Sequence, residues 1–118
     1  CQLGISKALA KLRERGVLII GSGNVVHNLG ALQFNGKAHD WALEFDNVFA
    51  DKLNQRDFAS LANTKVLGSL LRMANPSLEH YAPALTIAGA ASAKDQLVYI
   101  SEGIDLGAIS MRSFMFHA

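Results

Sequence analysis

The sequence lacks the features that mark membrane proteins, disulfide-stapled scaffolds and nucleic-acid-binding proteins. Of its 118 residues 50% are hydrophobic, but its apolar runs, such as residues 17–20, fall far short of the roughly 18 to 20 residues that a transmembrane helix needs. The eleven Lys and Arg residues nearly balance the ten Asp and Glu residues, and the basic residues form no cluster. We therefore expect neither nucleic acid nor a membrane as a partner. The single cysteine, Cys1, cannot form an internal disulfide, which favours a reducing compartment, by default the cytoplasm.

The start of the chain shows neither an initiator Met nor the charged-then-apolar pattern of a signal peptide. It opens on Cys1-Gln2-Leu3-Gly4, which indicates a piece of a longer protein. No internal repeat, low-complexity tract or linker indicates a second domain.

The first third predicts a helix, a buried strand and a glycine loop. Four apolar residues recur at helical spacing: Ile5, Ala8, Leu9 and Leu12. Gly16 follows where a helix C-cap belongs. Residues 17–20 form a continuous aliphatic run that stops at Gly21-Ser22-Gly23, the pattern of a strand buried on both faces. This order of elements is typical of an α/β layered domain.

The middle third predicts further helices. Three polar residues are expected N-caps: Asp40, for a helix to about Asn54, Asp57, for residues 58–62, and Thr64, for residues 65–73. A turn at residues 34–37 precedes the first of them, and a chain break at residues 75–77 follows the last. Pro83 fits the first turn of another helix, to about residue 93, because proline there loses no hydrogen bond.

The last third changes to the composition of β-strands. Residues 96–101 and 108–116 are rich in β-branched and large apolar side chains, and residues 102–107 separate them. We therefore expect two strands here.

The segment Gly21-Ser22-Gly23-Asn24-Val25-Val26-His27-Asn28-Leu29 is the first candidate for chemistry. A glycine-rich loop at the C-terminal end of a buried strand is where α/β sheets place ligand sites. A dinucleotide fingerprint would need a third glycine where Val26 stands, so nucleotide binding rests on the two glycines alone. In the competing interpretation the loop delivers His27 into a cleft as a general acid or base or as a metal ligand. The alternative is a purely structural role, in which His27 only forms hydrogen bonds within the loop.

His80 follows Glu79 at a second chain break before a helix. His27, His80 and Glu79 are residue types that bind iron or zinc, and metal sites gather ligands from separate loops. A lone histidine at such a break is more often structural than a ligand, so both roles stay open for His80.

Two further histidines and one arginine are weaker candidates. His39 adjoins a predicted surface helix and His117 is the penultimate residue, so we expect both to be solvated. Arg112 is a charge inside an apolar strand; we expect it to face outward, and an anchor for an anion or carboxylate is the alternative.

Three segments, in order, resemble a known family. They are residues 21–29, then Pro76-Ser77-Leu78-Glu79-His80-Tyr81-Ala82-Pro83-Ala84-Leu85, and then Glu102-Gly103-Ile104-Asp105-Leu106-Gly107-Ala108-Ile109-Ser110-Met111-Arg112-Ser113. They are similar to successive blocks of the LigB-type (class III) extradiol ring-cleavage dioxygenases, and most similar to the 4,5-DOPA dioxygenase subgroup. The resemblance implies an α/β fold with part of a mixed central sheet flanked by helices. It also implies that residues 1–118 are the C-terminal part of a single domain whose N-terminal part is absent.

The function that the resemblance implies is an extradiol catechol dioxygenase. Such an enzyme uses dioxygen to open the ring of a catechol such as DOPA at a non-haem metal, which is Fe(II) in the active dioxygenases and sometimes zinc in isolated members. His27 matches the histidine that serves in the superfamily as the second-sphere acid/base catalyst and that in DOPA-type members is close enough to count as a metal ligand, so both roles stay open for it. His80 matches the C-terminal metal position, with Glu79 as the fallback ligand. Gly30 departs from the family, since many relatives carry a basic residue there, and this bears on substrate preference.

The implied metal site is incomplete in these 118 residues. We therefore expect the fragment alone to bind iron or zinc weakly and to be inactive. Exposed strand edges would favour a homo-oligomer or domain exchange. The alternative function is a non-enzymatic binding protein of the same fold.

Overall fold

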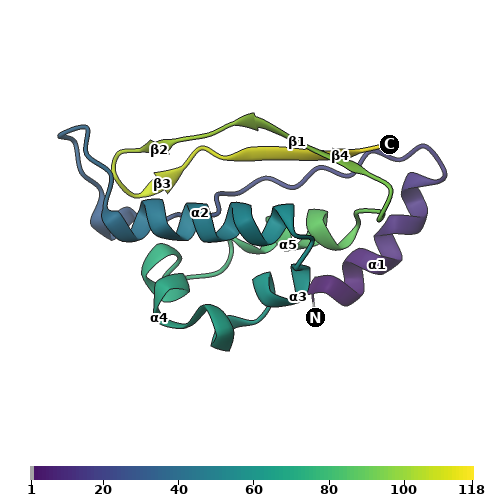
Figure 1. Cartoon of the computed structure of the whole chain (residues 1–118), viewed down its shortest axis with the longest axis horizontal. Helices are drawn as coiled ribbons and strands as arrows, with labels where there is room; N and C mark the ends of the chain where they lie inside the picture. Colours follow the sequence, from purple (N-terminus) through teal and green to yellow (C-terminus); the bar gives the residue numbers. More distant parts are fainter. Residues whose placement is uncertain (1) are drawn as a thin grey trace.

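The computed structural model describes residues 2–118, with side chains from residue 4 onward, so Cys1 lies outside the described part. The elements in chain order are α1 (Gln2–Arg13), the 3-10 helix η1 (Leu29–Ala31), α2 (Asp40–Asn54), α3 (Phe58–Leu61), α4 (Thr64–Ala74), α5 (Ala82–Gly89), β1 (Gln96–Ser101), β2 (Ile104–Asp105), β3 (Ile109–Ser110) and β4 (Ser113–His117). Figure 1 shows the strands in one layer and α2 and α5 together on one side of it. Helices packed on a strand layer confirm the predicted α/β class.

The helices arise largely where local signals predict them. Gly16 follows α1 in the left-handed region, with φ of +82°, as a C-cap glycine does. Asp57 caps α3, because its carboxylate accepts a hydrogen bond from the Ser60 backbone N–H at 3.2 Å. Pro83 lies in the first turn of α5, as expected, although this helix already ends at Gly89.

Two predicted caps are displaced by one residue. His39, and not Asp40, is the N-cap of α2, so the aspartate begins the helix itself. Asn63, and not Thr64, caps α4, because its side-chain oxygen accepts from the N–H groups of Lys65 and Val66. Asparagine is at least as good a cap as threonine, and here it stands one position earlier.

The strand predicted at residues 17–20 does not form, and that prediction was wrong. The segment is extended, but Leu18 and Ile20 are 78% and 79% exposed. Among the described residues, the backbone of residues 18–23 makes no backbone hydrogen bond to another segment. An aliphatic run becomes a strand only when a neighbouring strand satisfies its N–H and C=O groups, and this segment has no such neighbour in residues 2–118.

The C-terminal third holds four strands instead of the two expected. β1 forms as predicted and pairs antiparallel with β4, with Tyr99 opposite Phe114. The second predicted strand is divided into β3 and β4, and β2 lies inside the predicted separator and pairs antiparallel with β3. The β2–β3 turn has positive φ at Leu106 and Gly107, which lets the chain reverse within a few residues.

The core lies between α2 and the later helices. Phe45, Phe49 and Leu53 are fully buried on one face of α2, which is the apolar stripe of an amphipathic helix. The ring of Tyr81, just before α5, packs edge-on against Phe45, with 5.8 Å between the ring centroids. The Tyr81 hydroxyl donates to the Leu61 carbonyl at 2.7 Å, and burial raises the pKa of this hydroxyl. In the part of the chain described here, no helix has the length and apolar character to cross a membrane.

Candidate functional site

The loop that carries His27 is held on one side by the segment leading into β3. The Ser110 N–H donates to the Val26 carbonyl at 3.0 Å, and the Asn28 N–H donates to the Ala108 carbonyl at 3.2 Å. These bonds form an antiparallel bridge centred on His27. The backbone at His27 is therefore fixed as in a strand.

The chain break after α4 holds the same loop from the other side. The His27 N–H donates to the Ala74 carbonyl at 2.8 Å. The side-chain amide of Asn75, which is only 1% exposed, donates to the Val25 carbonyl at 2.7 Å. The sequence patterns did not single out Asn75. Its position, as a polar residue directly after a helix, is the signal that could have identified it as a residue that holds the loop.

The two glycines of the loop allow its backbone to pass close to the entry of α5. A Cβ on Gly23 would lie 2.3 Å from the His80 carbonyl oxygen, and a Cβ on Gly21 would lie 3.0 Å from the Pro83 carbonyl oxygen. The Asn24 N–H donates to that same His80 carbonyl at 2.8 Å. The glycine pair thus has a packing role that needs no bound phosphate, which removes the residue-level support for nucleotide binding.

These contacts bring together the two histidines that the sequence singled out. The imidazoles of His27 and His80 stack with their centroids 3.6 Å apart and their planes 7° from parallel. Burial, followed by the charge of His80, lowers the pKa of His27, and nearby Glu79 partly opposes this. Near neutral pH the His27 imidazole is therefore uncharged and can accept a proton or a metal bond.

The donor chemistry of this pair fits iron or zinc, but the pair is only part of a ligand set. Within residues 2–118, as far as the structure describes them, no cluster of three or more His, Cys, Asp or Glu side chains exists. Glu79, the fallback ligand, is exposed, and its carboxylate accepts a hydrogen bond from Ser77 at 3.1 Å. Because the nitrogen lone pairs lie in the ring planes, two parallel rings must tilt before both can bind one ion. His27 and His80 can therefore supply two of the ligands that a metal needs.

Two hollows meet at His80. One, of about 340 Å³, is lined largely by polar side chains: Ser22, Asn24, Ser110, Arg112 and Ser113. The other, of about 540 Å³, is mostly apolar and lies between residues 17–25, α5 and β4. His80 borders both hollows and His27 borders neither of these two, although both histidines are half-buried.

Arg112 does not face outward, contrary to expectation. Its side chain is 8% exposed, and it donates from Nη2 and Nε to the Asp46 carboxylate at 2.7 and 3.1 Å. Ser110 Oγ donates to the same carboxylate at 2.6 Å, and Arg112 Nη1 donates to Glu102 at 3.2 Å. The hydrogen bonds to Asp46 raise the pKa of Arg112. The alternative prediction, that Arg112 anchors a carboxylate, is the correct one, and the carboxylate is that of Asp46 in this chain.

His39 and His117 are both half-buried, so the expectation that they are solvated was wrong. His39 Nε2 lies 2.6 Å from the Ala31 carbonyl oxygen, and its ring stacks on Trp41 with 4.8 Å between the centroids. His117 borders the apolar hollow beside β4. Neither histidine joins the His27–His80 pair.

Comparison with known proteins agrees with the resemblance carried by the three sequence blocks. Residues 2–107 match the family described as the catalytic LigB subunit of aromatic ring-opening dioxygenase. The 4,5-DOPA dioxygenase extradiol of Escherichia coli (strain K12) is 32% identical over 117 residues, which cover 92% of this chain and 42% of that protein. The protein of the same name from Mirabilis jalapa is 39% identical over 101 residues, which cover 82% of this chain and 38% of that protein.

A solved structure extends the likeness to three dimensions. The crystal structure of an uncharacterized protein from Escherichia coli K12 is similar with a TM-score of 0.75 and 28% identity, over 96% of this chain and 48% of that one. The chain thus spans less than half the length of these relatives. Since the family match extends over nearly all of the described residues, the chain belongs to the family of the catalytic LigB subunit of aromatic ring-opening dioxygenase.

Proposed function

We propose that this chain is part of an extradiol dioxygenase that opens the ring of a catechol such as DOPA with dioxygen. The observation that carries the proposal is the stacked His27–His80 pair, which two separate loops bring together beside a polar hollow of about 340 Å³. Family membership supports the same reaction class. With its single cysteine, the protein is proposed to work in a reducing compartment, the cytoplasm.

In this proposal His80 is a ligand of a non-haem Fe(II) or Zn(II), and His27 is either a second ligand of that metal or the acid/base catalyst beside it. A bound iron would supply open coordination positions at which a catechol and dioxygen are held together. As the acid/base catalyst, the imidazole of His27 has a free ring nitrogen, which takes a proton from a catechol hydroxyl and returns it as the ring opens. The backbone bonds at His27 and Asn24 hold the two loops together, so only the imidazole rings need to turn for both histidines to face one metal ion.

The polar hollow is the proposed place for the substrate's substituent. Hydroxyl and amide groups of Ser22, Asn24 and Ser113 border it together with His80. Such groups can hydrogen-bond a polar side arm, which suits a catechol with a charged or hydrogen-bonding tail better than catechol itself.

Oxygen consumption tests this function. We expect Fe(II)-loaded protein that contains this chain within a full-length dioxygenase to consume oxygen with a catechol such as DOPA and to form a ring-opened product. His27→Ala and His80→Ala should each lower the rate by roughly 100-fold or more. His39→Gln is the matched control, because the His39 imidazole contacts Ala31 and Trp41 and not the pair.

The contrary result is equally clear. If the iron-loaded protein consumes no oxygen with any catechol, the alternative of a non-enzymatic binding protein with the same fold replaces the dioxygenase. The 118-residue chain by itself should bind iron or zinc weakly and show no turnover, because it offers only two ligands of the proposed set.

A further inference from the structure

Asn24 is the residue of the glycine-rich loop at which the two hollows and the histidine pair meet. Its backbone N–H donates to the His80 carbonyl at 2.8 Å, and its side-chain amide donates to the Ser110 carbonyl, also at 2.8 Å. Like His80, Asn24 borders both the polar hollow of about 340 Å³ and the apolar hollow of about 540 Å³. The two hydrogen bonds therefore fix the Asn24 side chain beside the histidine that borders both hollows.

The hydrogen bond to Ser110 also decides which way the Asn24 amide is turned. A carbonyl oxygen can only accept, so the amide nitrogen of Asn24 must face Ser110 and its amide oxygen must point away. In the part of the chain that the structure describes, Asn24 Oδ1 has no hydrogen-bond partner, and it is not among the buried unpartnered side-chain atoms. The Oδ1 atom of Asn24 is therefore an oriented acceptor that a bound molecule can reach.

The basic side chain at the polar hollow is already paired. Among the described residues, Arg112 is the only Lys or Arg that borders this hollow, and its side chain is 8% exposed. Each of its three nitrogen atoms donates to a carboxylate: Nε and Nη2 to Asp46 at 3.1 and 2.7 Å, and Nη1 to Glu102 at 3.2 Å. One positive and two negative side chains meet here, so the local net charge is negative.

Charged groups of opposite sign fare differently in such a hollow. An ammonium group donates a charge-assisted hydrogen bond to Asn24 Oδ1 and is attracted by the surplus carboxylate charge. A carboxylate meets an acceptor at Asn24 and, at Arg112, a guanidinium whose nitrogen atoms are engaged. It would therefore lose its hydration with little in return from these side chains.

We propose that Asn24 is a specificity-determining residue, whose Oδ1 accepts a hydrogen bond from the ammonium group of an aminoalkyl catechol held in the polar hollow beside His80. The inference rests on the proposed function, which brings a catechol to the His27–His80 pair, and it names the substituent that this side of the site selects. DOPA carries an ammonium and a carboxylate on the same carbon, so its ammonium faces Asn24 and its carboxylate is directed away.

Equilibrium binding in the absence of oxygen tests this preference. The protein is the Fe(II)-loaded full-length dioxygenase that contains this chain, kept anaerobic so that no ring opens. The probes are dopamine and dihydrocaffeate, in both of which two methylene groups separate the catechol ring from the charged group. Titration calorimetry at neutral pH should give a Kd for dopamine at least roughly tenfold lower than that for dihydrocaffeate.

Asn24→Ala should reduce this ratio of the two Kd values at least roughly fivefold, because it removes the acceptor for the ammonium group. The ratio is the readout, since a general disturbance of the loop weakens both ligands alike. Asn28→Ala is the matched control. Asn28 lies in the same loop and donates from its side-chain amide to the Met73 carbonyl at 2.8 Å, but it borders neither hollow. Its ratio should equal that of the parent.

A second variant tests the charge of the hollow without touching the loop. Glu102→Gln removes one of the two carboxylates at Arg112, so the ratio should fall about two- to fivefold. The Glu102 side chain is 59% exposed, and this variant should therefore fold as the parent does, which circular dichroism verifies. If Asn24→Ala does not fold, Glu102→Gln decides the question.

Three outcomes would overturn the inference. One is dihydrocaffeate binding as tightly as dopamine or more tightly, which would assign a carboxylate to this hollow. Another is an equal loss of affinity for both probes in Asn24→Ala, or an unchanged ratio in Glu102→Gln, because Asn24 would then only hold the loop or the local charge would not select. The third is a protein that binds neither probe, which would overturn the proposed function as well. In the first two cases the catechol still binds, so the proposed function stands.

Discussion

The Cα atom of Gly23 lies against the backbone of His80 so closely that no side chain fits between them. The Asn24 N–H bonds the same His80 carbonyl, so this contact sets the distance between the loop of His27 and the start of α5. The stacked imidazoles depend on that distance. A glycine that appears in the sequence as part of a ligand loop is thus a spacer for the histidine pair.

Gly23→Ala should therefore disturb the site as well as the fold. Its Cβ would lie 2.3 Å from a backbone oxygen, which cannot move aside as a flexible side chain can. We expect the free energy of unfolding in urea to fall by about 1–3 kcal/mol. The imidazole NMR signals of His27 and His80 should shift as the rings move apart. Gly30→Ala, which meets its nearest atom at an ordinary 3.5 Å, should change stability by less than about 0.5 kcal/mol.

The Asp46–Arg112 pair is the other residue-level determinant of the site. Both side chains are 8% exposed, and Ser110 adds a third donor to the carboxylate. The pair ties α2 to the strands whose backbone holds His27. Because Arg112 already bonds Asp46 and Glu102, its charge is neutralised within the chain, and the guanidinium is a poor anchor for a substrate anion.

Arg112→Met should remove about 3–5 kcal/mol of unfolding free energy, because it leaves the Asp46 carboxylate buried without its cation. Replacing both partners, with Asp46→Leu added, should cost less than the sum of the two single variants. Urea unfolding of the three variants measures this coupling. Additive losses would show that the two side chains do not stabilise each other.

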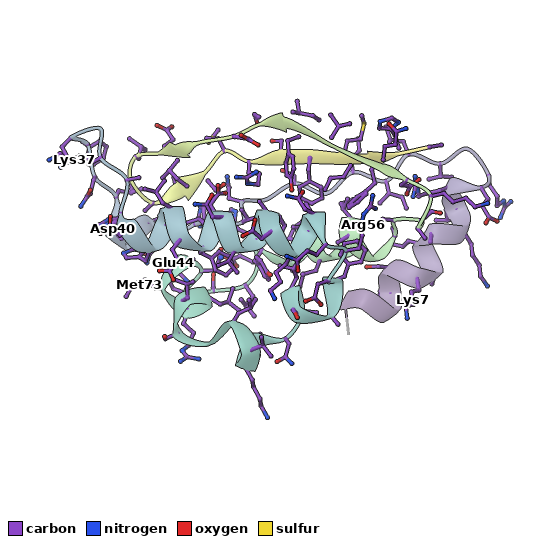
Figure 2. All side chains as sticks on the ribbon, in the orientation of Figure 1. Lys7, Lys37, Asp40, Glu44, Arg56 and Met73 are labelled. Carbon is purple, nitrogen blue, oxygen red and sulfur yellow. The ribbon has the colours of Figure 1, made fainter. Side chains whose placement is uncertain are left out.

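At the scale of elements, an ion pair from Arg13 ties α1 to the rest of the molecule, and α1 also packs on α5. Arg13 Nη1 lies 2.5 Å from Asp95 Oδ2, and the same guanidinium donates to the Ala90 carbonyl at 3.0 Å. Asp95 is also held by Arg56, whose guanidinium donates to the Asp95 backbone carbonyl at 2.6 Å. Figure 2 shows Arg56 near the end of α2. The hydrogen bond from Arg13 holds the pKa of Asp95 below its ordinary value.

This pair should make stability dependent on acid pH. Since the pKa of Asp95 is lower in the folded than in the unfolded chain, its contribution is complete above the ordinary pKa of an aspartate and is lost as the pH falls from there through the lowered folded-state pKa. The difference in unfolding free energy between the parent and Asp95→Asn should therefore shrink as the pH falls. In the background of Arg13→Ala most of this pH dependence should vanish. A difference that stays constant from neutral to acid pH would contradict the assignment.

Elements whose signals are local were predictable, and elements that need a partner were not. The amphipathic spacing of α1, the Asp57 cap and the proline of α5 act within a few residues, and each appears where it was predicted. Residues 17–20 have the composition of a buried strand, yet a strand needs a neighbour, and the sequence pattern cannot say whether one is present. The division of residues 108–116 into two strands arises in the same way, from pairing with β2 and β1.

At the scale of the whole molecule, the helices and the strands form an asymmetric arrangement. α2 and α5 cover one side of the strand layer, and apolar side chains remain exposed on the other side and along residues 17–20. This asymmetry agrees with a chain that spans 42% of the Escherichia coli DOPA dioxygenase. The placement of these residues as the C-terminal part of the domain stays a prediction, which alignment to a full-length parent sequence would test.

The sequence by itself determined most of the helices, the glycine-rich loop, the family and the choice of His27 and His80 as candidates, because short-range spacing and residue type encode all of these. Only the tertiary structure decided that His27 and His80 stack, that Arg112 is buried against Asp46, and that residues 17–20 remain an unpaired edge. These features depend on contacts between residues far apart in the chain, and composition cannot specify which distant groups meet. The physical reason is that burial, pairing and charge neutralisation are properties of a group together with its neighbours.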